Sequence, residues 1–255
     1  MNSRRSHTYF ISDLHLGARY IPDARAHEEA VCRFLRHIAP TAKRLFMVGD
    51  VLDYWYEYRT VVPRGYVRFF GALAELADAG VEIVWFTGNH DIWLFDYLRD
   101  EIGIRITDPA KGYELTELDG TLFCIGHGDA IGPQKAGFRF IRSLFRNRLC
   151  QWMFAAIHPR WTVGFAHAWS SHSRKGCLTP VALEPGARAG LELFCRRMAS
   201  EHPGLRYVVV GHHHVPVDEP VSPDCRLIVL GDWLTRHTYA VFDGKTLTLS
   251  EYEDR

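Results

Sequence analysis

The sequence has no long hydrophobic run, and its few cysteines are scattered. None of its 255 residues belongs to a run of roughly 18 apolar residues, the length that a transmembrane helix needs. The apolar stretch after Met1 is short and soon meets Asp13, so it does not fit a signal peptide. The six cysteines include no C-x-x-C pair, a pattern typical of thiols in a reducing compartment. We therefore expect a cytoplasmic protein, or one on the cytosolic face of a membrane.

Acidic residues are missing from one long stretch, between Asp129 and Glu184. The stretch holds eight aromatic and eight basic residues, although the net charge of the whole chain is zero. The rest of the chain therefore carries 22 basic against 30 acidic residues. A neutral average thus conceals an acidic body and a basic, aromatic segment. The basic residues of this segment are Lys135, Arg139, Arg142, Arg146, Arg148, Arg160, Arg174 and Lys175.

Strand and helix patterns alternate along the first half, and antiparallel pairs follow. Hydrophobic residues make up 47% of the chain, enough to bury a core and to exclude a disordered protein. The expected helices are Ala24–Ile38, Val67–Ala79 and Arg188–Ala199. The expected strands are Thr8–Ser12, Arg44–Val48, Glu82–Phe86, Tyr113–Leu118, Thr121–Ile125, Tyr207–Val210 and Leu227–Leu230, with a final pair around Asp243-Gly244. This order predicts an α/β fold, with one mixed sheet or two packed sheets and helices outside.

One break in composition, about 133–176, interrupts a chain that we otherwise expect to form a single domain over residues 1–255. This segment is expected to be mainly helical and to form a cap. A basic, aromatic, acid-free cap suits a protein that reaches an anionic membrane surface and holds acyl chains. Its aromatic residues could equally form a core between cap helices, and its basic residues a solvated face.

Polar side chains of the kinds that bind metal ions follow five of the expected strands. Because strand ends at one edge of a sheet converge, we expect these side chains to lie close together. Glycines beside them allow the backbone to turn sharply and to approach closely. The five motifs are Asp13-Leu14-His15, Gly49-Asp50 with Asp53, Gly88-Asn89-His90-Asp91, Gly126-His127-Gly128-Asp129 and Gly211-His212-His213-His214.

The residue types of these motifs indicate a site for two metal ions. Aspartate, histidine and asparagine, without cysteine, suit divalent ions such as Mn²⁺, Fe²⁺ or Zn²⁺. The candidate ligands are too many for one ion, whereas two ions about 3.5–4 Å apart, bridged by a carboxylate, form a hydrolytic pair. Taken singly, Asp13 or Asp50 could instead cap a helix. His213 is expected to point away, and Asp129 either caps the following helix or touches the site.

In this order the motifs resemble those of the calcineurin-like metallophosphoesterases: D-x-H, G-D-x-x-D, G-N-H-D/E, H-G and G-H-x-H. The resemblance implies a two-sheet αββα sandwich with a helical cap insertion, and two divalent ions, expected to be Mn²⁺. It implies that His90 faces the phosphoryl group as general acid or electrostatic partner, and that Asp53 orients it. The implied ligands are Asp13, His15 and His214 for one ion, Asn89, His127 and His212 for the other, and Asp50 as the bridge.

A closer resemblance covers nearly the whole chain. The run from His127 through Phe140, followed by Trp152 and Phe154, is similar to the UDP-2,3-diacylglucosamine diphosphatases of lipid A synthesis. These enzymes hold two acyl chains under a helical lid and release UMP and a lipid 1-phosphate. The sequence departs from the best-known branch at His90, where that branch has arginine. It also has Phe138 where an aromatic hydroxyl is often found.

The resemblance implies a nucleotide-linked glycolipid as substrate and a peripheral place on the anionic inner membrane. Asn89 and His90 would contact the substrate, together with Ser173, Arg174 and Lys175 at the end of the cap. One alternative is a soluble phosphodiesterase or phosphatase for a small ester, in which the cap serves only specificity. A metal-free scaffold would lack ligands, and the acidic body argues against a nuclease, so no nucleic acid partner is expected. The sequence does not predict the oligomeric state.

Overall fold

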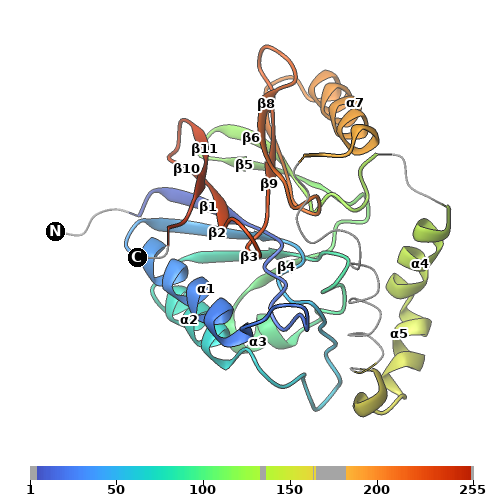
Figure 1. The fold of residues 1–255 in the computed structure, drawn as a ribbon. Coiled ribbons are helices and arrows are strands. Elements are labelled where there is room, and N and C mark those ends of the chain that lie inside the picture. Colours follow the sequence, from blue (N-terminus) through green and yellow to red (C-terminus); the bar gives the residue numbers. More distant parts are fainter. Residues whose placement is uncertain (1–4, 133–135, 163, 165–181, 254–255) are drawn as a thin grey trace.

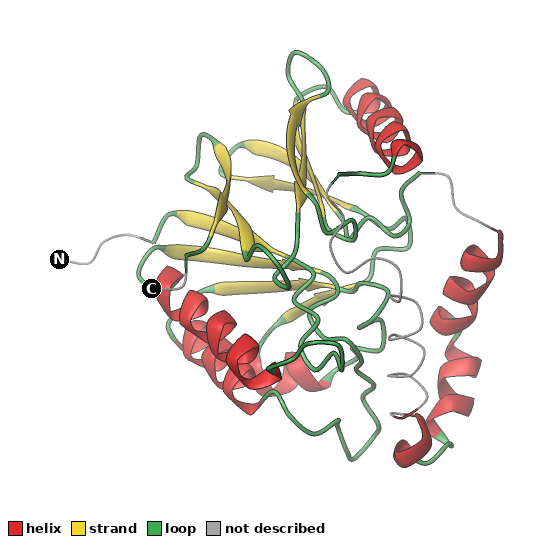
Figure 2. Cartoon of the chain, viewed as in Figure 1, coloured by secondary structure: helices red, strands yellow, loops and turns green. Residues whose placement is uncertain are grey.

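Two β-sheets pack face to face, and helices cover the outer face of each sheet (Figure 1). The structure, a computed structural model, describes residues 5–132, 136–162, 164 and 182–253. The expected substrate contacts Ser173, Arg174 and Lys175 lie outside the described residues. Figure 2 shows the strands as two inner layers with helices on either side. The two-sheet sandwich that the motifs predicted is thereby confirmed.

The first sheet has six strands in the order β11-β10-β1-β2-β3-β4. Strands β1 to β4 are parallel, while β10 runs antiparallel to β1 and to β11. Helices α1, α2 and α3 lie on its outer side (Figure 1). The bounds are β1 His7–Ile11, β2 Ala42–Val48, β3 Glu82–Phe86, β4 Arg105–Thr107, β10 Thr238–Phe242, β11 Leu247–Glu251, α1 Ala24–Ile38, α2 Val67–Asp78 and α3 Tyr97–Ile102.

The second sheet has five strands in the order β5-β6-β7-β9-β8. Strands β6, β7 and β9 are parallel, and the edge strands β5 and β8 are antiparallel to their neighbours. Helix α7 covers the outer face with Leu191, Phe194 and Met198. The bounds are β5 Glu114–Leu118, β6 Thr121–Ile125, β7 Leu205–Val210, β8 Pro216–Pro220, β9 Arg226–Leu230 and α7 Pro185–Glu201.

Aromatic side chains fill the space between the sheets. Phe10 of β1 stacks on Phe46 of β2 and, across the interface, on Phe123 of β6, with ring centroids 5.2 and 5.8 Å apart. Phe123 in turn stacks on Tyr207 of β7. The central strands are buried on both faces, which explains their nearly continuous apolar sequences.

The sequence patterns missed three short elements, α3, β4 and β8. Helix α3 has six residues and β4 has three, too few to show a period. Strand β8 begins and ends with proline and carries Asp218 and Glu219, so its composition resembles a loop. Proline and charge are tolerated there because β8 lies at the edge of its sheet.

Two helices, α4 (Ala136–Arg146) and α5 (Arg148–Ala155), stand to one side of the sandwich, away from both sheets (Figure 1). Asn147 separates them and begins α5, because its side chain accepts hydrogen bonds from the N–H groups of Leu149 and Cys150. Both helices fall within the expected cap, residues 133–176, of which 133–135, 163 and 165–176 lie outside the described residues. No helix in the described ranges is both long enough and apolar enough to cross a membrane.

Candidate metal centre

The motif residues follow the carboxyl ends of parallel strands in both sheets. Strands β1, β2 and β3 of the first sheet supply three motifs, and β6 and β7 of the second sheet supply two. The expectation that one sheet edge holds the whole site was therefore wrong. The strand ends of two sheets meet there instead, because the sandwich brings both sets of carboxyl ends to the same side of the molecule.

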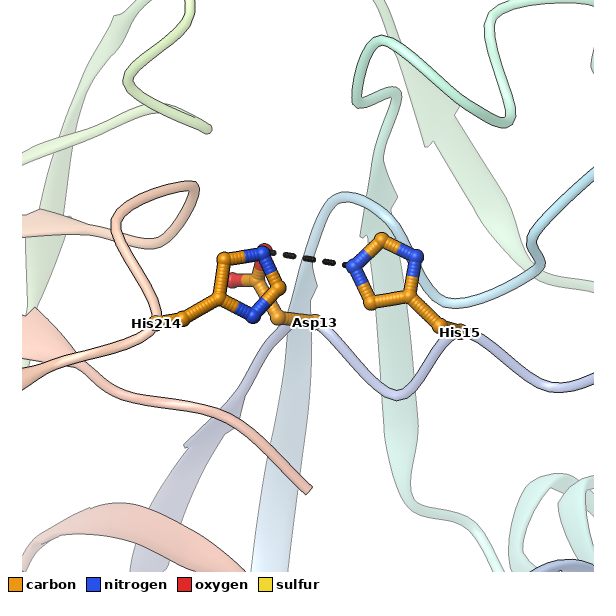
Figure 3. A group of neighbouring side chains, drawn as sticks. All are labelled: Asp13, His15 and His214. Carbon is orange, nitrogen blue, oxygen red and sulfur yellow. Dashed lines mark ion pairs between the residues drawn. The ribbon is translucent and has the colours of Figure 1, made fainter. Parts of the chain in front are cut away.

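Asp13, His15 and His214 form one group of potential metal ligands. Figure 3 shows the two imidazole rings directed toward the Asp13 carboxylate. Oδ1 of Asp13 lies 3.7 Å from Nε2 of His15 and 3.3 Å from Nε2 of His214. Their ligand atoms all lie within 4.8 Å of one another, so one ion could contact all three.

A second group consists of Asp50, His127 and His212, whose ligand atoms also lie within 4.8 Å of one another. Nε2 of His127 lies 3.3 Å from Oδ2 of Asp50. The same nitrogen lies 3.3 Å from Oδ1 of Asn89, which brings this amide oxygen to the group. The four side chains are those that the family resemblance assigned to the second ion and to the bridge.

Asp50 lies between the two groups. Its Oδ2 atom is 3.8 Å from Nε2 of His15 in the first group and 3.3 Å from Nε2 of His127 in the second. A carboxylate in this position can contact two ions at once. The structure therefore brings all seven predicted ligands close together.

Asp53 contacts the imidazoles of His15 and His90, and these three side chains form a further group whose ligand atoms lie within 4.8 Å of one another. Its Oδ1 atom lies 3.7 Å from Nδ1 of His15 and 3.5 Å from Nδ1 of His90. Nδ1 of His90 also lies 3.0 Å from the backbone carbonyl of Asp53, which can only accept, so Nδ1 carries the proton. Nε2 of His90 then faces the site, 4.0 Å from Oδ2 of Asp50.

The donor atoms fit divalent cations, and one buried oxygen among them has no hydrogen-bond donor. Oδ1 of Asp13 is buried and accepts no hydrogen bond. A buried carboxylate oxygen without a donor is costly, and a bound cation would remove that cost. Oxygen and imidazole nitrogen ligands without sulfur suit divalent ions of borderline or hard character.

Proton affinities within the site are strongly perturbed. Burial acts to raise the pKa of Asp50, but the neighbouring His127, His90 and His15 hold it well below its usual range. Burial acts to lower the pKa of His127, but Asp50 and Asp13 raise it to about 10. Burial and His127 lower the pKa of His212 to about 3. A metal ion would therefore compete with a proton for His127, because only the neutral imidazole binds metal.

Five of the seven predicted ligands adopt left-handed backbone conformations. The φ angles are 54° at Asp13, 45° at His15, 52° at Asp50, 68° at His212 and 56° at His214. Residues other than glycine avoid this region, and such strain gathers at functional sites. The surrounding fold holds the loops in these conformations, which direct the candidate ligands toward one another.

Glycines next to the ligands leave room for the metal-binding atoms. A Cβ atom at Gly88 would lie 2.2 Å from Oδ1 of Asp50, and one at Gly211 would lie 2.5 Å from Oδ2 of Asp13. Any side chain at either position would displace a predicted ligand. The expected close approach at these glycines is confirmed.

Comparison with known proteins identifies the family. Residues 6–216 match the model of the calcineurin-like phosphoesterases. The chain belongs to this family. It is 41% identical to the UDP-2,3-diacylglucosamine hydrolase of Porphyromonas gingivalis, over 98% of this chain and 99% of that protein. It is 30% identical to the protein of the same name from Ralstonia nicotianae, over 88% of this chain and 83% of the relative. The phosphoesterase is thus a hydrolase of phosphate esters or anhydrides that uses divalent metal ions.

Sequence reasoning gave no role to two buried carboxylates of the phosphoesterase, Asp91 and Asp232. Asp91 accepts hydrogen bonds from the N–H groups of Val51 and Gly88, at 2.9 and 2.7 Å, and so ties together the loops that follow β2 and β3. Burial and Asp50 raise its pKa to about 6. Oδ2 of Asp232 lies 3.5 Å from Nδ1 of His214 and can orient that ring. Each of the two aspartates follows a glycine at the end of a strand, Gly88 after β3 and Gly231 after β9, and this pattern could have pointed to them in the sequence.

The structure shows the contacts of Asp129, whose role the sequence left open, and the position of His213, which was predicted not to bind metal. Asp129 is buried, and its Oδ2 accepts a hydrogen bond of 2.8 Å from Nε of Arg142 in α4. Burial acts to raise the pKa of Asp129, but His127 and Arg142 hold it below its usual range. Asp129 therefore joins the His127 loop to α4. His213 belongs to none of the ligand groups among the described residues, in agreement with its expected non-ligand role.

Proposed function

We propose that this phosphoesterase hydrolyses the pyrophosphate bond of UDP-2,3-diacylglucosamine to UMP and 2,3-diacylglucosamine 1-phosphate, a step of lipid A biosynthesis. The similarity to the Porphyromonas gingivalis hydrolase carries the proposal, because it extends over 98% of the chain and so includes both the metal centre and the cap. The chemistry also fits. The substrate has a diphosphate for the metal centre and two acyl chains that need an apolar surface.

The metal centre would hold two ions, expected to be Mn²⁺. Asp13, His15 and His214 would bind one, and Asn89, His127 and His212 the other, with Asp50 in contact with both. When bound, the ions neutralise negative charge on the phosphoryl group and lower the pKa of water.

His90 would act on the substrate through Nε2. Its other nitrogen is held by the carbonyl of Asp53, so the ring cannot rotate without losing a hydrogen bond. Nε2 lies beside Asp50, at the edge of both ligand groups, where it can hold a proton for the leaving group or stabilise phosphoryl charge. Asp53 sets the ring orientation, and Asn89 would contact both metal and substrate.

The cap would hold the acyl chains above this site, as an insertion in a single domain. Helices α4 and α5 and the residues that follow them up to Thr162 expose several large apolar side chains, and Trp152 and Trp161 are each 70% exposed. Such a concentration of apolar surface on a polar protein marks a site for lipid or protein. Among the described residues of this segment, the other exposed large apolar side chains are Phe140, Leu144, Leu149, Met153 and Ile157.

The same segment would bind the anionic cytosolic face of the inner membrane. Arg142 and Arg146 point inward and pair with Asp129 and Asp108, whereas Arg139, Arg148 and Arg160 are exposed. Each exposed basic residue near an anionic leaflet contributes about 1 kcal/mol. Together with the exposed tryptophans, they support peripheral binding.

Vesicle sedimentation tests the membrane proposal. The protein should sediment with vesicles that contain anionic phospholipid and less with neutral vesicles. Trp152→Ala should weaken the binding, whereas Leu193→Ala, which removes an equally exposed side chain from α7, should not. Equal effects of the two changes would contradict the assignment of this surface.

Hydrolysis of two substrates tests the function. The protein with Mn²⁺ should convert UDP-2,3-diacylglucosamine to UMP and the lipid phosphate in equal amounts, and should act far more slowly on a simple aryl phosphodiester. Near-equal turnover of both would favour the alternative, a phosphodiesterase for small esters.

A further inference from the structure

The cap helices rest on the loops that carry the catalytic motifs. Four buried residues of these loops, Tyr54, Tyr56, Ile92 and Trp93, form an apolar cluster with Phe145 of α4 and Phe154 of α5. The ring of Trp93 lies 5.3 Å from that of Phe145 and 4.7 Å from that of Phe154. Tyr56 lies 5.0 Å from Phe154. One aromatic residue from each cap helix therefore packs on the catalytic loops.

Two directed hydrogen bonds fix the position of the helices on this cluster. The hydroxyl group of Tyr56 donates to the carbonyl of Gln151 in α5, at 2.6 Å. Nε1 of Trp93 donates to the carbonyl of Phe145, at 2.9 Å. Phe145 lies in the last turn of α4, where carbonyl groups lack partners within the helix. Aromatic packing alone would allow the helices to slide, whereas these two bonds, together with the pairing of Arg142 with Asp129 and of Arg146 with Asp108, hold them in one register.

The two donors are fixed relative to the catalytic residues. Tyr56 follows Asp53 by three positions, and Trp93 follows His90 by three positions. Tyr56 and Trp93 pair with each other as a parallel β-bridge. The loops that hold the catalytic residues are thus joined at the point where the cap is attached.

Glu57 reinforces this junction. Its Oε2 atom accepts hydrogen bonds from the N–H groups of Phe95 and Asp96, at 2.6 and 2.8 Å, and Oε1 accepts one from Nε1 of Trp55. The backbone N–H of Glu57 donates to the carbonyl of Trp93, at 3.3 Å. A buried carboxylate that accepts several hydrogen bonds holds the loop after Asp53 and the loop after His90 together. A shift of the cap on these loops should therefore also shift the residues of the site.

We propose that Tyr56 and Trp93 are positioning residues that set the place of the cap over the metal centre and thereby determine how tightly the lipid part of the substrate is held. The choice of lipid substrate rests on the proposed function, while the attachment of the cap rests on geometry alone. The two residues act through α4 and α5 and not on the reacting phosphoryl group.

Tyr56→Phe and Trp93→Phe test the proposal, because each removes one donor and keeps an aromatic ring. Tyr9→Phe is the matched control, since it removes from β1 a hydroxyl that is hydrogen-bonded at 2.8 Å to Thr41, the residue before β2, away from the cap. One neutral hydrogen bond changes an opening equilibrium about two- to tenfold. Hydrogen–deuterium exchange of residues 136–162 should accelerate by this factor in both variants and not in the control.

Kinetics give the second measurement. Both variants should raise the KM for UDP-2,3-diacylglucosamine about two- to tenfold, with kcat within about twofold of the unaltered protein and a smaller effect on the aryl phosphodiester. Unchanged exchange in α4 and α5 would overturn the proposed attachment, whatever the substrate. Faster exchange with equal losses on both substrates would overturn the link to lipid binding. If the unaltered protein does not hydrolyse the lipid, the proposed function fails, and exchange still decides the attachment.

Discussion

Nε2 of His127 lies 3.3 Å from Oδ2 of Asp50, although the two residues come from different sheets. Asp50 follows β2 in the first sheet, and His127 follows β6 in the second. Both side chains are buried, so the contact joins the two layers at the centre of the site. Changes at Asp50 should therefore affect every part of the metal centre.

Asp50→Ala should be the most damaging single change among the ligands. The carboxylate lies between both ligand groups, so its loss should weaken both metal positions. We expect turnover at saturating Mn²⁺ to fall at least about 10³-fold, as when a major electrostatic element is removed. Asp224→Ala, a change at an exposed carboxylate, is the control. Activity of Asp50→Ala within tenfold of the unaltered protein would refute the bridging role.

His90→Ala should lower turnover and leave metal content intact, because His90 is assigned to the phosphoryl group. Loss of its proton transfer or charge should cost roughly 10²–10⁴-fold in turnover. His127→Ala is the matched comparison, since it should lower both turnover and metal content. Metal analysis by mass spectrometry separates the two. Loss of an ion from His90→Ala would place His90 among the ligands.

Asp91→Ala should destabilise the fold, because it leaves several buried donors without an acceptor. The N–H groups of Val51 and Gly88 and Nε1 of Trp85 all donate to this carboxylate. Each buried donor that is left unsatisfied costs about 1–3 kcal/mol. Urea denaturation of the metal-free protein should show a decrease of at least this size. A decrease below 0.5 kcal/mol, on the order of a surface substitution, would show that Asp91 does not hold the loops.

Removal of metal by a chelator should lower the melting temperature. The Asp13 carboxylate keeps a buried oxygen that accepts no hydrogen bond, and a bound ion would stabilise the folded state alone. At a concentration of 100 times its dissociation constant, one ion contributes about 2.7 kcal/mol, or roughly 5–10 °C in a chain of this size. Added Mn²⁺ should restore the loss, as calorimetry can measure. Identical melting temperatures with chelator and with Mn²⁺ would contradict the fit of this site to metal.

Replacing both Arg174 and Lys175 by Ala should raise the KM for the diacyl substrate, since we predict that they contact its sugar phosphate. Hydrolysis of the aryl phosphodiester should change by less than about threefold, because the metal centre is untouched.

Trp152→Ala should also raise the KM for the diacyl substrate and leave hydrolysis of the aryl phosphodiester nearly unchanged, because its side chain is exposed on α5. Phe154→Ala should have the same selective effect and should in addition accelerate hydrogen–deuterium exchange of the cap helices, since Phe154 packs against Trp93. Equal losses on both substrates would show that the cap belongs to the catalytic scaffold.

The sequence by itself predicted the candidate ligands, the strands that carry them and the length of helix α1. These features are local: ligand type, adjacent glycine and apolar periodicity can all be read within a few residues. It also indicated the two-sheet sandwich, through the order of five motifs. The short elements α3 and β4 escaped notice because six and three residues show no period.

Only the tertiary structure decided that the site lies between two sheets and that the cap rests on its loops. It revealed Asp232 beside His214 and the hydrogen bonds by which Glu57 joins two loops of the site. It also showed that Arg142 and Arg146 pair with carboxylates of the body, so these two basic residues do not face a membrane. These contacts join parts of the chain that are distant in sequence, such as Tyr56 and Gln151. Local preferences cannot specify such pairs, because their geometry exists only after the two sheets have packed.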